Sequence, residues 1–155
     1  MNEKHKSLKT AYGMLSIPVI ISAIILMVLS GGAIYIMSIA LEDTNGGGWL
    51  LFGVILIAIV FFPSILAGVL QVIFYVAGIR KYKKNDIENV RTYGLISAIS
   101  SIVGNAYIVL FGYRWFFNDE AEKDFYLLGV IAIAFIIYGA IIVGIFIKAK
   151  QAVDK

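Results

Sequence analysis

The stretch Arg80-Lys81-Tyr82-Lys83-Lys84-Asn85-Asp86-Ile87-Glu88-Asn89-Val90-Arg91 is the longest polar segment between the two ends of a very apolar chain. It divides the 155 residues into two halves, and each half contains two long apolar runs. Apolar residues make up 61% of the chain and charged residues 15%, against roughly half and a quarter in a soluble domain. This excess indicates that the lipid bilayer is the main partner and solvent of the protein.

Four apolar runs reach the length of about 20 residues that a helix needs to cross a membrane. They are residues 14–41, 49–79, 93–113 and 125–147. Because each run is apolar throughout rather than alternating, helices are favoured over transmembrane strands. We therefore predict an all-α membrane protein, a four-helix transmembrane bundle that forms a single domain over residues 1–155, with loop 80–92 between its halves.

Two features predict irregularities inside the first two helices. The second run is longer than a hydrocarbon core of about 30 Å requires, and Pro63 near its middle predicts a kink there. The first run carries Gly31-Gly32 toward its far end, and such a pair permits either a bend or close contact with another helix.

Basic residues are concentrated in alternate polar segments. All but two of the 13 Lys and Arg residues lie in the N-terminal tail, the middle loop and the C-terminal tail. The other two loops contain Arg114 and Lys123 together with six of the ten acidic residues. Because Lys and Arg are retained on the cytoplasmic side of membranes, we predict a multi-pass protein of the cell (cytoplasmic) membrane with both termini and loop 80–92 in the cytoplasm.

A similarity between the two halves predicts an internal repeat. Lys9-Thr10-Ala11-Tyr12-Gly13 resembles Arg91-Thr92-Tyr93-Gly94, and in both copies two apolar residues and a Ser follow. Residues 51–58 match residues 127–134 at six of eight positions. The repeats, 9–79 and 91–150, would be two tandem helical hairpins in parallel orientation. Chance is the alternative explanation, because Ile, Val, Leu and Gly dominate both halves.

The apolar runs lack the residues that membrane enzymes and proton-coupled antiporters use. None of them contains Asp, Glu, Lys or His in its interior, and the chain contains no Cys. Intramembrane charges usually mark functional sites, and a zinc site needs three or four suitable ligands. We therefore expect no catalytic residues, no metal and no cofactor, and the protein is predicted not to be an enzyme.

Uncharged polar residues occur at similar distances from the basic end of each run, which predicts a polar layer across the bundle. Its members are Ser22, Gln71, Ser101, Asn105 and Tyr138. One interpretation is hydrogen bonding between helices, worth about 0.6–2 kcal/mol per contact. The other is a small polar cavity for a neutral or lipidic ligand or an ion.

The third run carries a row of small and polar residues at helical spacing. The row consists of Gly94, Ser97, Ser101, Gly104, Asn105 and Gly112. Small residues let helices approach closely, and hydroxyl and amide groups bond between them, so this helix is predicted to be the most buried of the four.

The basic residues of the middle loop are Arg80, Lys81, Lys83, Lys84 and Arg91. Membrane topology is a sufficient explanation for them, and it removes the need for a nucleic-acid partner. The alternatives are binding of anionic lipid headgroups, at about 1 kcal/mol per Lys or Arg, or docking of an acidic partner protein.

These patterns favour a non-catalytic protein that acts by helix–helix contact. It would be an accessory, immunity or regulatory partner of other membrane protein subunits, or it would self-associate into an oligomer. The alternative is a small channel or transporter that uses the polar layer.

Overall fold

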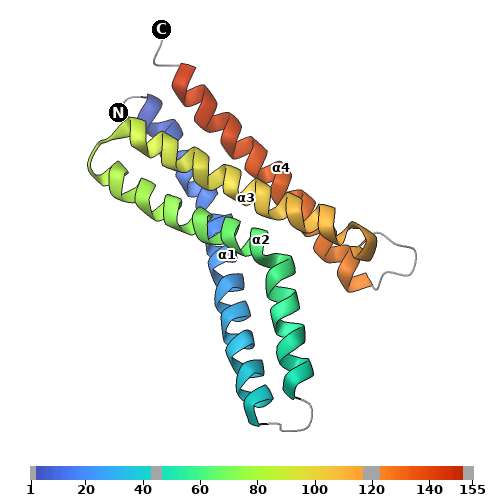
Figure 1. Cartoon of the computed structure of the whole chain (residues 1–155). Coiled ribbons are helices and arrows are strands. Elements are labelled where there is room, and N and C mark those ends of the chain that lie inside the picture. The colour runs from blue at the N-terminus through green and yellow to red at the C-terminus, as the bar shows by residue number, and fades with distance from the viewer. Residues whose placement is uncertain (1–2, 43–46, 117–122, 152–155) are drawn as a thin grey trace.

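The computed structural model describes residues 3–42, 47–116 and 123–151, which form four long α-helices (Figure 1). The helices are α1 (Glu3–Glu42), α2 (Gly47–Lys83), α3 (Ile87–Phe116) and α4 (Lys123–Gln151). Each contains a segment long and apolar enough to span a membrane. The predicted fold class is therefore confirmed as an all-helical bundle with four candidate membrane spans.

The helices extend beyond the apolar runs at both ends. α1 has 40 residues and is therefore about 60 Å long, twice a hydrocarbon core of about 30 Å. Most of the polar stretch 80–92 is also helical, because α2 continues to Lys83 and α3 begins at Ile87. Lys, Arg and Glu are good helix formers, so a helix continues past the point where its residues stop being apolar.

A tight turn of Lys84, Asn85 and Asp86 joins α2 to α3. Asn85 has a φ of 56°, a left-handed conformation that Asn tolerates better than most residues. The backbone N–H groups of Lys84 and Asp86 both donate to the carbonyl of Lys81, at 3.0 and 3.2 Å. Asp86 then caps α3 by accepting from the backbone N–H of Asn89 at 3.4 Å. The turn thus ends one helix and starts the next within three residues.

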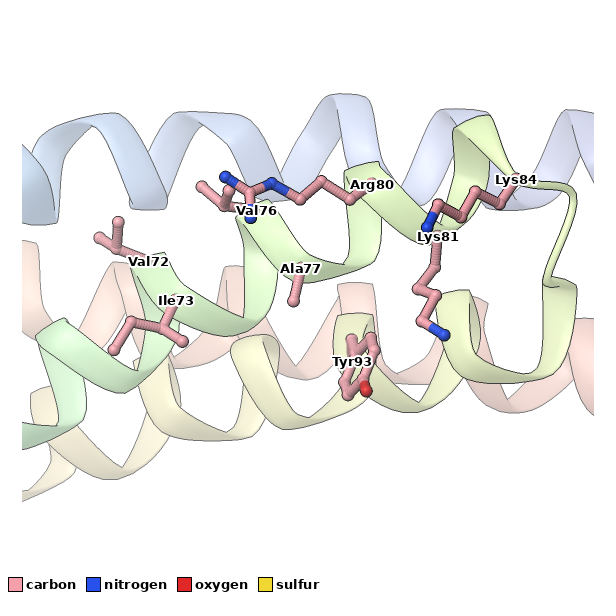
Figure 2. A pocket seen from close by; sticks show the side chains of 8 residues that line it. All are labelled: Val72, Ile73, Val76, Ala77, Arg80, Lys81, Lys84 and Tyr93. Carbon is pink, nitrogen blue, oxygen red and sulfur yellow. The ribbon is translucent and has the colours of Figure 1, made fainter.

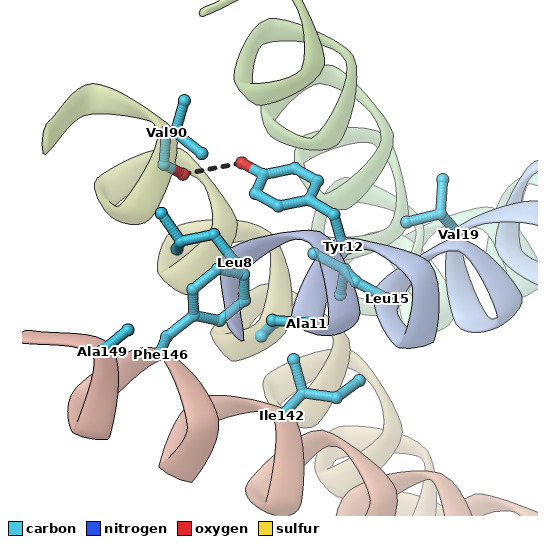
Figure 3. Packing of buried hydrophobic residues seen from close by; sticks show 10 residues of the cluster. Leu8, Ala11, Tyr12, Leu15, Val19, Val90, Ile142, Phe146 and Ala149 are labelled. Atoms are coloured by element: carbon cyan, nitrogen blue, oxygen red, sulfur yellow. Dashed lines mark hydrogen bonds between the residues drawn. The ribbon is translucent and has the colours of Figure 1, made fainter. Parts of the chain in front are cut away.

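The buried core lies at the end of the bundle that holds the N-terminus, the α2–α3 turn and the C-terminal end of α4, which we call the basic end (Figure 1). Side chains of α1, α3 and α4 meet there (Figure 3). The cluster comprises Leu8, Ala11, Tyr12, Leu15, Val19, Val90, Ala98, Ile142, Phe146 and Ala149. Across the described chain α2 contacts α1 and α3, and α4 also contacts α1 and α3.

The two hairpins diverge away from the basic end. The Ser64 hydroxyl of α2 donates to the Gly104 carbonyl of α3 at 3.1 Å. Beyond this contact, Figure 1 shows α2 changing direction about midway along its length and leaving α3 to follow α1. Pro63 is the 17th of the 37 residues of this helix and therefore lies close to its midpoint. Proline lacks the N–H that the carbonyl four residues earlier would accept, which explains the predicted kink. We call residues 24–42 of α1 and 47–62 of α2 the outer arm.

α3 is the most buried helix among the described residues, as its row of small and polar residues predicts. In its apolar segment 28% of residues are buried, against 6%, 17% and 22% in α1, α2 and α4. Its Gly94 lies directly under the ring of Phe146, whereas Gly13, the equivalent position in the predicted repeat, is surrounded by open space. The two copies of the Tyr-Gly pattern therefore occupy different environments, and the duplication itself stays a prediction.

Candidate functional site

Gln71 of α2 is the centre of the polar contacts inside the bundle. Its side chain is only 1% exposed. The Ser22 hydroxyl of α1 donates to its Oε1 atom at 2.9 Å, and the Ser97 hydroxyl of α3 donates to its backbone carbonyl at 2.8 Å. One residue thus connects three helices, and we call this group of Ser22, Gln71 and Ser97 the Gln71 junction.

The other predicted members of the polar layer make separate contacts. The Asn105 side-chain amide donates to the backbone carbonyl of Ser101, one turn away in the same helix, at 2.8 Å. The Tyr138 hydroxyl of α4 donates to the backbone carbonyl of Met14 of α1 at 3.1 Å. The structure therefore brings Ser22 and Gln71 into direct contact, pairs Asn105 with Ser101, and places Tyr138 in an α4–α1 contact of its own.

Two hydroxyl groups that join helices, Ser97 and Ser64, are missing from the predicted layer. Ser97 precedes Ser101 by four residues and therefore lies on the same helix face. This spacing is the sequence signal that would place Ser97 in the polar layer. Ser64 follows Pro63, where the kink turns α2 toward α1, and its contact with Gly104 depends on how α2 and α3 cross.

One polar atom of the Gln71 amide is unsatisfied. Its Nε2 atom is buried and has no hydrogen-bond partner among the described residues. Exchanging the two amide atoms would let Nε2 donate to Ser22 but would leave Oε1 without a donor, so one atom is unpaired in either orientation. A buried unpaired polar group costs about 1–3 kcal/mol. The junction therefore joins three helices and retains one unused hydrogen-bonding site.

The chemistry of the junction is limited to hydrogen bonding. Hydroxyl and amide groups can hold helices together or bind a neutral polar group, but they provide no general base of suitable pKa. Fold and site together define a small all-helical bundle with four candidate membrane spans, whose helices are joined by uncharged polar contacts. Comparison with protein-family models, curated proteins and solved structures found no match.

Proposed function

We propose that the protein is a non-catalytic membrane subunit that acts through helix–helix contact in the bilayer, as an accessory, immunity or regulatory partner or as a self-associating oligomer. The observation that supports this proposal is the outer arm. On its α1 side, Met27, Val28, Ile34 and Tyr35 are between 67% and 71% exposed. The arm thus presents an apolar surface that the rest of the described chain leaves uncovered.

Consecutive small residues distinguish the surface of the outer arm from that of a helix that faces only lipid. Ser30, Gly31, Gly32 and Ala33 are consecutive, and a Cβ atom at either glycine would meet nothing within 4 Å among the described residues. Gly78, Gly94 and Gly139, by contrast, each lie against a side chain of a neighbouring helix. Small residues let a second helix approach closely in a membrane, so contact outside this chain is a physical use for Gly31 and Gly32.

The charge distribution supports an orientation for this contact. The basic end would lie in the cytoplasm under the positive-inside rule, which places the outer arm toward the opposite face of the membrane. A partner helix would then meet α1 within the bilayer, away from the packed core around Phe146. The core would hold the fold while the arm makes the contact.

Larger side chains in the arm are expected to abolish the contact. Gly31→Leu and Gly32→Leu leave the fold intact, because both positions are open, but they hold a second helix further away. Photocrosslinking in native membranes, from a probe at exposed Ile34, should trap a specific product in the unmodified protein and lose it in both variants.

Gly13→Leu is the matched control, because Gly13 is also open but lies in the opposite part of α1. It should retain the crosslinked product. A probe at Ile34 that traps only lipid in native membranes, or a product that survives at both glycine variants, would contradict the proposal.

The unpaired amide of Gln71 supports a second candidate, a small channel or transporter with a polar path through the junction. Gln71→Met removes the Ser22 bond and the unpaired amide together, so stability should change by no more than about 1 kcal/mol. Ser22→Ala should destabilise more, since it leaves both amide atoms without a partner.

A flux assay in liposomes tests the transport path itself. A solute flux that stops in Gln71→Met and Asn105→Leu would favour transport, whereas a flux that persists in both variants would exclude this path.

A further inference from the structure

An open groove of about 490 Å³ lies along α2 at the basic end and borders α3. Figure 2 shows the eight side chains around it. Six come from the last three turns of α2, one is the turn residue that follows this helix, and one comes from α3. They are Val72, Ile73, Val76, Ala77, Arg80, Lys81, Lys84 and Tyr93.

The six α2 residues and Lys84 form two parallel rows, and each row changes from apolar to basic residues toward the end of the helix. One row is Val72, Val76, Arg80 and Lys84, and the other is Ile73, Ala77 and Lys81, each at intervals of four residues. Residues four apart are neighbours on one helix face. The groove therefore has an apolar part within the candidate membrane span, and a basic part begins one helical turn further along α2, about 6 Å from Val76 to Arg80 at the helical rise.

The wall of the groove on α3 is the ring of Tyr93. This ring packs beside Phe74 of α2, with ring centroids 5.9 Å apart. Ala77 is small, and it leaves room in front of the tyrosine (Figure 2). Ile73 and Val76 are 54% and 42% exposed, so the apolar part is open to the side, where the hydrocarbon of a bilayer would lie.

The three cations of the groove are not equivalent. Lys81 pairs with Asp86 at 3.1 Å, and hydrogen bonds from the Asn89 side chain and from Lys81 hold the pKa of Asp86 below its usual range. Asp86 therefore stays ionised and neutralises Lys81. Arg80 and Lys84 form no ion pair within the described part of the chain. Figure 2 shows the Arg80 side chain reaching back along α2 to Val76, and the Lys84 side chain reaching back toward Lys81.

We propose that this groove binds an anionic phospholipid. The phosphate lies between Arg80 and Lys84, whose charges no acidic residue of the described chain balances. An acyl chain follows Val72 and Val76, the apolar residues of the same row. Arg suits this role because its guanidinium binds phosphate oxygens through two parallel hydrogen bonds.

The position of the groove favours a lipid over an acidic protein. Its apolar residues belong to a segment of α2 that is apolar enough to span the membrane. A soluble partner could reach the cations but not Val72 or Ile73. A phospholipid offers an anionic headgroup to the cations and an acyl chain to the apolar residues. The lipid contact also lies away from the outer arm, so it is independent of the proposed function.

Binding is tested on the purified full-length protein in detergent, by native mass spectrometry with phosphatidylglycerol and phosphatidylcholine of identical acyl chains. Phosphatidylglycerol should bind more tightly. Arg80→Gln/Lys84→Gln should weaken its binding about 30-fold, because each basic residue near a membrane surface contributes roughly fivefold. The charge-preserving variant Arg80→Lys/Lys84→Arg should retain most of the affinity.

Lys9→Gln/Lys148→Gln is the matched control, since it removes two exposed charges from the same end of the molecule but outside the groove. It should leave the affinity for phosphatidylglycerol unchanged. Equal binding of the two lipids, or an equal loss in both double variants, would overturn the proposal. So would displacement of the lipid by an equal concentration of glycerol phosphate, because the apolar row would then contribute nothing.

Discussion

Replacing Phe146 by alanine is expected to lower the free energy of unfolding by about 3 kcal/mol, the lower end of the range for a buried aromatic residue. The ring is fully buried at the basic end, meets the ring of Tyr12 edge-on at 5.6 Å, and covers Gly94 of α3 (Figure 3). The lower end applies because lipid is as apolar as the core, so the loss comes from packing rather than from exposure to water.

Equilibrium unfolding in mixed detergent and SDS micelles, followed by intrinsic fluorescence, measures this loss. Ile147→Ala is the control, because Ile147 is the next residue, at the same depth, and is 48% exposed. It removes a large apolar side chain without opening a cavity. Equal destabilisation by the two variants would show that Phe146 does not fill the contact between α1, α3 and α4.

Gly78→Ala is expected to destabilise the protein by about 1–3 kcal/mol, the usual cost of overpacking. A Cβ atom at Gly78 of α2 would overlap the hydroxyl of Tyr12. That hydroxyl cannot move freely, because it donates to the Val90 carbonyl at 2.7 Å and its ring is 8% exposed. The new methyl group would therefore force α1 and α2 apart or break the bond to α3.

Two comparisons identify the cause in the same unfolding assay. Gly68→Ala, in the same helix, should cost nothing, since a Cβ there would lie 3.6 Å from Leu26, an ordinary contact distance. Tyr12→Phe should cost about 1 kcal/mol for the lost hydrogen bond. The double variant Gly78→Ala/Tyr12→Phe should be more stable than the sum of the single effects, because the overlapping atom is gone. Strict additivity would show that Gly78 and Tyr12 do not share this contact.

Both substitutions fall in the part of the molecule that joins the hairpins. The single side chain of Tyr12 contacts all three other helices: Gly78 and Tyr75 of α2, Val90 of α3 and Phe146 of α4. The outer arm, by contrast, diverges from α3 and α4 (Figure 1). Local stability follows the density of such contacts, so we place the rigid framework at the basic end and the proposed partner contact in the arm.

Several features were readable from residues alone because each depends on local physics. Hydrocarbon leaves no water to satisfy the backbone, so a long apolar run must be helical, and four runs determine four helices. Pro63 removes an N–H wherever the chain folds, so a kink in α2 follows. Asn85-Asp86 is a sequence signal for the short turn, because Asn tolerates the left-handed conformation and Asp caps the next helix. The predicted loop 80–92 is longer than this turn, since most of the stretch is helical.

The candidate sites depended on tertiary structure, because identical residues acquired different roles. Gly13 and Gly94 share a sequence pattern, yet one faces open space and the other lies under Phe146. Spacing along each run brought Ser22 and Gln71 to the same depth, but the rotation of the helices decided that they bond and that Tyr138 bonds elsewhere. The groove likewise needed Tyr93 of α3 beside α2. Composition and periodicity determine which segments enter the membrane, whereas only the packed structure decides which faces meet.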